Sequence, residues 1–104
     1  MGIQNFYFMG WSMNQFEQYL MDNCNGRDNA IKSPELERIF RCKGTVIREM
    51  VNESRCRGIP ICSDSKGYYY SSAEQDIAKT IANLSSRISN IEAARDGLRK
   101  RITK

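Results

Sequence analysis

The chain contains no histidine, only two prolines and no long apolar run among its 104 residues. Its four cysteines include no Cys-x-x-Cys pair, so we predict reduced thiols, no metal site and no cofactor. A phosphate-binding loop and a nucleophile elbow are also missing, which argues against an enzyme. The apolar stretch 3–11 is too short for a signal peptide or a membrane span, so we expect a cytoplasmic protein without membrane contact.

Positive charge is distributed unevenly along the chain, whose net charge is +4. Residues 1–31 hold one base and three acids, residues 32–72 hold eight bases and five acids, and residues 73–104 hold seven bases and four acids. The first segment is therefore acidic and the other two are basic. This distribution favours a polyanionic partner for the central and C-terminal parts.

Start signals predict two helices in the first part of the chain. Ser12 and Gln15 form a capping box for a helix over 13–23, which places apolar residues on one face. Ser33 followed by Pro34 is typical of an N-cap with proline at the first helical position. We therefore expect a second helix that begins after Ser33.

The next segment predicts a third helix and a β-hairpin. Thr45 is the expected N-cap of a helix that runs to about Arg57, and Gly58 occupies the position where a left-handed residue ends a helix. Two β-prone runs follow, Ile59–Cys62 and Tyr68–Tyr70, on either side of a loop that contains glycine. Such a pair of runs predicts a hairpin.

The C-terminal third carries a heptad pattern. Ser72 and Gln75 form a second capping box, which opens a helix of about 30 residues. Apolar residues then recur at heptad spacing, with Arg95 at one a position: Ile77, Ile81, Leu84, Ile88, Ile91, Leu98 and Ile102. We expect a parallel homodimer in which Arg87 faces Glu92 of the partner helix. The isoleucines at d positions also fit a trimer, and a helix folded back on its own domain is the alternative.

Residues 31–70 resemble the winged helix-turn-helix modules of small phage and prophage proteins. The matching residues are the helix pair 33–41 and 45–57 with Ile47-Arg48, Val51-Asn52 and Ser54-Arg55, then Gly58-Ile59-Pro60-Ile61-Cys62 and Gly67-Tyr68-Tyr69. Ser54 departs from this pattern, which usually has leucine there. The resemblance implies a mainly α fold with a small β-hairpin, and DNA binding in transcription control or phage replication.

In such a module the third helix would enter the major groove. Arg48 and Asn52 are the base-reading candidates, because arginine can bond guanine and asparagine can bond adenine. The other candidates for DNA contact are Lys43 and Thr45 at the helix entrance, Arg55 on its outward side, and Arg41, Arg57 and Lys66 for phosphates.

These observations predict a winged helix-turn-helix domain with an N-terminal arm over 1–72 and a coiled-coil dimerisation helix over 73–104. The expected function is a DNA-binding phage or prophage regulator, or a replication accessory protein, that acts on duplex DNA as a dimer. The alternative is an inhibitor of host machinery of the anti-CRISPR type, which would dock on a host protein through Glu49 and Glu53. A third hypothesis, a structural assembly adaptor, is supported only by the predicted coiled coil. The aromatic arm Phe6–Trp11 would either cover the core or contact a partner.

Overall fold

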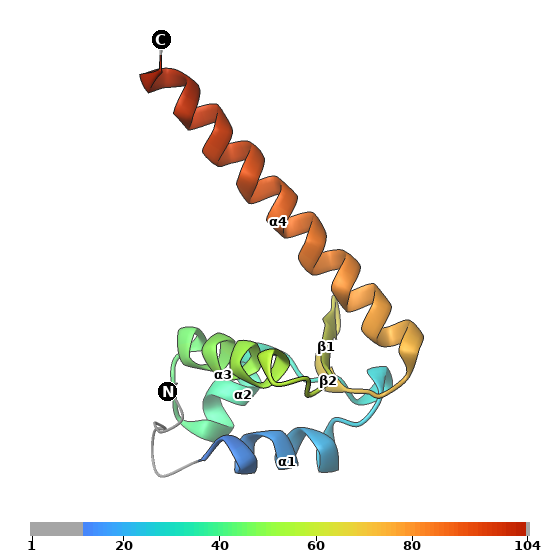
Figure 1. Ribbon diagram of the computed structural model, residues 1–104. Coiled ribbons are helices and arrows are strands. Elements are labelled where there is room, and N and C mark those ends of the chain that lie inside the picture. The colour runs from blue at the N-terminus through green and yellow to red at the C-terminus, as the bar shows by residue number, and fades with distance from the viewer. Residues whose placement is uncertain (1–11, 104) are drawn as a thin grey trace.

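The computed structural model describes residues 12–103, so the expected roles of the aromatic arm lie outside the described residues. Short helices and a two-stranded hairpin form a head, residues 12–72, from which one long helix projects (Figure 1). The elements are α1 (Met13–Asn23), the 3-10 turn η2 (Arg27–Asn29), α2 (Ser33–Phe40), α3 (Gly44–Cys56), β1 (Ile61–Asp64), β2 (Gly67–Tyr70) and α4 (Glu74–Ile102). The structure is therefore mainly helical, with a small antiparallel hairpin and a long C-terminal helix, as predicted.

The core of the head lies between α1, α2, α3 and one face of the hairpin. Its buried apolar side chains are Phe16, Leu20, Cys24, Leu36, Phe40, Ile47, Met50, Val51 and Ile61. Phe16 and Phe40 pack edge to face, with ring centroids 5.3 Å apart. Tyr19 packs on Phe40 in the same way at 5.6 Å. These contacts hold α1 against α2 through buried area and favourable ring geometry.

The predicted start of α1 is confirmed. Ser12 Oγ accepts a hydrogen bond from the Gln15 backbone N–H at 3.2 Å, and Gln15 Oε1 accepts one from the Ser12 N–H at 2.8 Å. The predicted N-cap at Ser33 is wrong by one residue, because α2 begins at Ser33 and its N-cap is Lys32. The Ser33 hydroxyl instead donates to Glu37 Oε2 at 2.9 Å, so it bonds a side chain one turn further along α2.

Two other predicted caps are also wrong. Thr45 lies inside α3, whose N-cap is Lys43. Ser72 is exposed and makes no capping bond at the start of α4. The buried residue before it, Ser71, supports this end of α4, because its hydroxyl donates to Asp76 Oδ2 at 2.7 Å.

Glycine at position 58 ends α3 as the sequence predicts. Gly58 has a φ of +87°, in the left-handed region that favours glycine. The backbone N–H of Gly58 bonds the Arg55 carbonyl at 2.9 Å, and that of Ile59 bonds the Ser54 carbonyl at 3.0 Å. This is the paired bonding of a Schellman motif, which satisfies the last carbonyls of the helix and turns the chain toward β1.

The hairpin pairs Ile61 with Tyr70 at its base and Asp64 with Gly67 at its tip. A third segment joins it, because Ile31 forms an antiparallel bridge with Tyr68 just before α2. Gly67, with a φ of +125°, permits this approach, since an added Cβ would lie 2.3 Å from the Ile31 carbonyl oxygen. The hairpin is therefore tied to the chain that enters α2.

The long helix α4 leaves the head after its first three turns. Thr80 is buried, while Ile77 and Leu84 are half-buried against the head. Every described residue from 85 to 103 is exposed, so α4 does not fold back on the head over this range. The alternative of a helix that covers its own domain is therefore wrong for its distal part. Among the helices of residues 12–103, none combines the length and apolar character needed to cross a membrane.

Candidate functional site

The outward face of α3 carries three of the residues predicted to contact DNA. Apolar residues at i, i+3 and i+4 turn one face inward, and Ile47, Met50 and Val51 are buried there. Thr45, Arg48 and Asn52 are all exposed. Their positions on the helical wheel lie opposite the buried residues, so the three side chains share one outward face.

Arg48 is a free cation on this face. No carboxylate lies within ion-pair distance of Arg48 or Lys43 in the described part of the chain. The Glu37 and Arg48 side chains both lie beside Gly44: a Cβ added to this glycine would lie 3.0 Å from Glu37 Oε2 and 3.7 Å from an Arg48 guanidinium nitrogen. The missing side chain at Gly44 thus leaves room for these two side chains, and Arg48 is exposed.

Arg55 does not lie on the same outward face, contrary to expectation. Its Nε donates to the Ile61 carbonyl at 2.7 Å, and a terminal nitrogen donates to Ser63 Oγ at 3.1 Å. Burial lowers the pKa of the Arg55 guanidinium from its usual value, and the positive charge of Arg87 also lowers it. Arg55 therefore holds β1 against the end of α3, and only part of its donor capacity faces solvent.

Arg57 is neutralised by carboxylates of the head, which the sequence did not reveal. Its guanidinium pairs with Glu17 of α1 and lies 3.9 Å from a Glu53 oxygen. Glu17 is only 7% exposed and also accepts a hydrogen bond from the fully buried Ser54 hydroxyl. The expected phosphate contact at Arg57 thus carries little free charge. The serine in place of leucine at position 54 was the one signal in the sequence that a polar partner was needed there.

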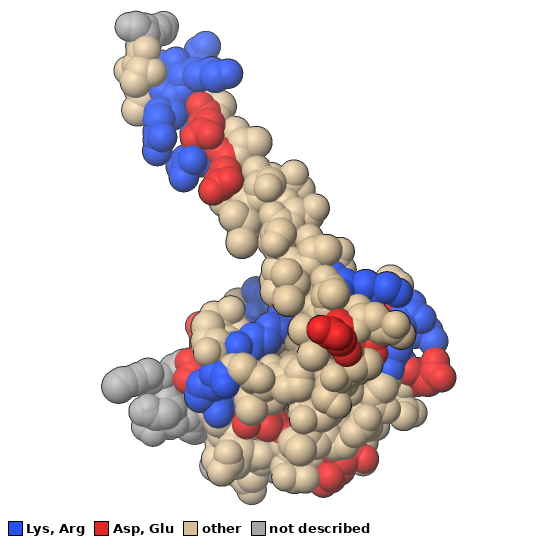
Figure 2. Space-filling view, turned by 45° about the vertical axis from the view of Figure 1, so that its right-hand side comes forward, with Lys and Arg blue, Asp and Glu red and all other residues tan. Residues whose placement is uncertain are grey.

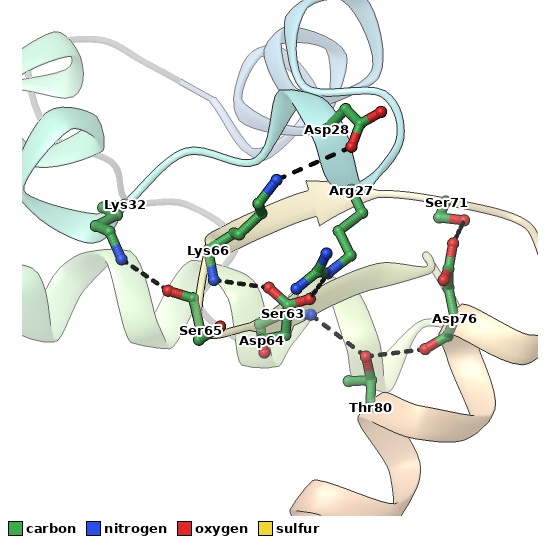
Figure 3. Close-up of polar contacts among 10 residues, drawn as sticks. All are labelled: Arg27, Asp28, Lys32, Ser63, Asp64, Ser65, Lys66, Ser71, Asp76 and Thr80. Atoms are coloured by element: carbon green, nitrogen blue, oxygen red, sulfur yellow. Dashed lines mark hydrogen bonds and ion pairs between the residues drawn. The ribbon is translucent and has the colours of Figure 1, made fainter.

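Polar contacts fix the tip of the hairpin (Figure 3). Lys32 Nζ donates to the Ser65 carbonyl at 2.7 Å, and the Lys66 N–H donates to Asp64 Oδ1 at 2.8 Å. Arg27 pairs with the Asp64 carboxylate and holds its pKa below the usual value. Lys66 itself is exposed, with its Nζ 3.9 Å from Asp28 Oδ1. The tip is therefore held in place by these contacts, and the exposed Lys66 side chain is directed toward Asp28 (Figure 3).

A basic cleft lies beside the hairpin tip and was not predicted. Lys32, Arg55 and Arg87 line a pocket of about 350 Å³ together with Ser63 and Ser65. The Asp64 carboxylate also lines this cleft, and two of its cations are bonded within the head, Lys32 to the Ser65 carbonyl and Arg55 to the Ile61 carbonyl. The residues come from the start of α2, the end of α3, the hairpin and α4, so only the fold brings them together.

Arg41 is the last of the predicted contact residues. It is exposed at the end of α2 and has a φ of +53°, the one left-handed conformation of a non-glycine residue in the described chain. Its backbone N–H bonds the Glu37 carbonyl. Arg41 therefore lies in the turn between α2 and α3, two residues before Lys43, the N-cap of α3.

The described residues thus group into an exposed face of α3 (Thr45, Arg48 and Asn52), a turn with Arg41 and Lys43, and a hairpin tip with Lys66. Arg55 and Arg57 are engaged within the head.

No group of histidine, cysteine and acidic residues that could hold a metal ion occurs in residues 12–103. Comparisons of the chain with protein-family models, with curated proteins and with solved structures each found no match.

Proposed function

We propose that this protein binds duplex DNA through the outward face of α3 and does so as a homodimer, in the role of a phage or prophage regulator or replication accessory protein. The observation that carries the proposal is the exposed, unpaired Arg48 beside Asn52 on a helix held by a rigid head. A major groove of about 12 Å admits one α-helix. Arginine and asparagine are the side chains best suited to guanine and adenine edges.

The arrangement of the head supports a winged helix-turn-helix fold. The order of α1, the Ile31 bridge, α2, α3 and hairpin corresponds to a helix, a short strand, a helix pair and a two-stranded wing. In that arrangement Lys66 lies at the wing tip, and Arg41 and Lys43 lie at the turn before the recognition helix. Lysine and arginine at such positions fix the register of the protein on the phosphate backbone.

A dimer would match the two-fold symmetry of paired DNA half-sites. Beyond the head, α4 exposes Ile88, Ile91, Leu98 and Ile102 by 57 to 82% of their surface. A row of exposed isoleucine and leucine at heptad spacing is stabilised when a second helix covers it.

The direct test is fluorescence anisotropy on a labelled random duplex and on an enriched sequence, at about 50 and 200 mM salt. We expect binding that weakens steeply with salt. Arg48→Ala should weaken binding to the enriched sequence by about 1–3 kcal/mol, and Lys66→Ala should weaken both duplexes alike. Arg38→Ala is the matched control, because Arg38 is exposed on α2 near Tyr19 and away from the proposed face. An absence of binding at the lower salt would contradict the proposal and favour the inhibitor of a host protein.

A further inference from the structure

An apolar seam runs along α4 from the head to its free end. We define the seam as Ile77, Ile81, Leu84, Ile88, Ile91, Arg95, Leu98 and Ile102. On the face shown in Figure 2 the middle of the projecting helix is uncharged, and Lys and Arg side chains gather near its far end beside acidic ones. Exposure rises from 56% at Ile81 to 82% at Ile102. The described residues therefore leave most of the seam uncovered.

The seam leads into an apolar pocket at the base of α4. This pocket of about 290 Å³ lies between α4 and the turn that follows α3, and its lining includes Ile59, Pro60, Ile77, Ile81 and Leu84. Arg55 is the charged residue of the lining, and its Nε is bonded to the Ile61 carbonyl. A group that fills this pocket must be apolar and must reach the first turns of α4.

The spacing of the seam is the same in both chain directions. Its steps alternate 4, 3, 4, 3, 4, 3, 4 when Arg95 is counted. An antiparallel copy centred between residues 89 and 90 would therefore face Ile77 with Ile102, Ile81 with Leu98, Leu84 with Arg95 and Ile88 with Ile91. Six of the eight antiparallel layers are wholly apolar and two pair Leu84 with Arg95, whereas a parallel pair has seven apolar layers and one layer of two Arg95 residues. The apolar layers therefore differ by one, and the distribution of charge decides between the two orientations.

Charge favours the antiparallel orientation. In a parallel pair the two Arg95 guanidinium groups would occupy one layer, where like charges repel at short distance. In the antiparallel pair Arg95 faces the apolar Leu84 and keeps its own Asp96 partner at 2.9 Å. The parallel pairing of Arg87 with Glu92 lies at the solvated rim, and such pairs contribute little.

The two ends of α4 are also complementary. Glu74 and Asp76 lie in the first turn, and Arg99, Lys100 and Arg101 lie in the last turn. An antiparallel pair sets the basic end of each helix beside the acidic end of the other, which also aligns the helix dipoles favourably. A parallel pair would bring both basic ends together.

We propose that two copies of this chain pair antiparallel along the seam, with Leu98 and Ile102 of each copy covering the apolar pocket at the base of the other's α4. The inference specifies the orientation of the dimer in the proposed function and depends on that dimer. The heads then lie at opposite ends of the helix pair. Their attachments, centred between residues 80 and 81, are about 27 Å apart along the axis at 1.5 Å per residue.

Cysteine cross-linking of the full chain distinguishes the two orientations. The background carries Cys42→Ala, Cys56→Ser and Cys62→Ala, which removes the two cysteines that are not buried and the one that lines the pocket. Ile81→Cys and Leu98→Cys are made separately, mixed and oxidised. We expect a disulfide between the two variants in the mixture, because the two positions face each other, and almost none for Leu98→Cys alone, whose copies would lie about 25 Å apart. Ala93→Cys, at an outward position, is the control.

A disulfide formed by Leu98→Cys alone would overturn the antiparallel orientation and leave the dimer intact. A chain that remains monomeric in light scattering would overturn both the orientation and the dimer. The DNA anisotropy experiment with Arg48→Ala measures binding by the face of α3 separately from these cross-links, so failure of the orientation and failure of DNA binding remain distinguishable.

Discussion

The Ser54 hydroxyl of α3 donates a hydrogen bond to the Glu17 carboxylate of α1, and both side chains are buried in the head. Arg57, the C-cap of α3, pairs with the same carboxylate. A buried carboxylate is stable only when donors surround it. This small polar cluster therefore joins α1 to the end of α3 and fixes where α3 lies on the core.

Ser54→Ala should destabilise the head. Removing the hydroxyl leaves part of the Glu17 carboxylate without a donor, which typically costs about 1–3 kcal/mol of unfolding free energy. Urea denaturation measures the change. The double variant Glu17→Ala with Ser54→Ala should lose less than the sum of the two single losses, because the second change removes a partner that is already gone. Additive losses would contradict a shared buried bond.

The start of α4 should depend on Ser71 and not on Ser72. Ser71 Oγ accepts the Ala73 N–H at 3.1 Å and donates to Asp76, whereas Ser72 is exposed. Ser71→Ala should lower the unfolding free energy by about 1 kcal/mol, because a buried hydroxyl loses its two hydrogen bonds. Ser72→Ala is the matched control, and its unfolding midpoint in urea should stay close to that of the parent. Equal effects of the two changes would argue against this assignment.

Stability should fall in acid partly through Asp64. The hydrogen bond from Arg27 holds the Asp64 pKa below its unfolded value of about 3.9. The ion pair thus stabilises the fold above pH 4, and this contribution is lost as the pH falls through the lower folded pKa. The melting temperature of Asp64→Asn should lie below that of the parent at pH 7. This difference in melting temperature should be smaller at pH 3, as measured by circular dichroism. Arg27→Gln should show the same decrease in this difference. A difference in melting temperature that does not change with pH would show that the ion pair does not contribute to the acid sensitivity.

Arg41→Gly should separate stability from DNA affinity. The left-handed φ of Arg41 costs a non-glycine residue about 1 kcal/mol, and glycine relieves this cost but loses more backbone entropy on folding. We expect a small net change in unfolding free energy, within about 0.5 kcal/mol. Affinity for duplex DNA should fall at low salt because one phosphate contact is removed. Unchanged affinity in anisotropy would remove Arg41 from the proposed interface.

A charge in the middle of the seam should dissociate the dimer. Ile88→Asp places a carboxylate in an apolar layer, where burial of an unpaired charge is unfavourable. Light scattering on the full chain should then report a monomer. Ala93→Asp is the control, because Ala93 lies on the outward side of α4 and its substitution should leave the dimer unchanged. A dimer that survives Ile88→Asp would show that the seam is not the interface.

Local signals were sufficient for much of the fold. The Ser12 capping box, the left-handed Gly58 and the hairpin are each decided by residues a few positions apart, and all three are confirmed. Caps at Ser33, Thr45 and Ser72 were wrong because serine and threonine hydroxyls have several backbone and side-chain partners within reach. Neighbouring elements select among those partners, so the residue type alone does not fix the helix start.

The sequence by itself determined the helix periods, the turn residues and the apolar seam of α4, because these depend on contacts over one or two helical turns. Only the tertiary structure decided which arginines keep a free charge. Arg48 stays in solvent, whereas Arg55 bonds β1 and Arg57 is paired with Glu17, 40 residues earlier in the chain. These partners come into contact only when the helices and the hairpin pack around the core, and the spacing of residues along the sequence does not predict such contacts.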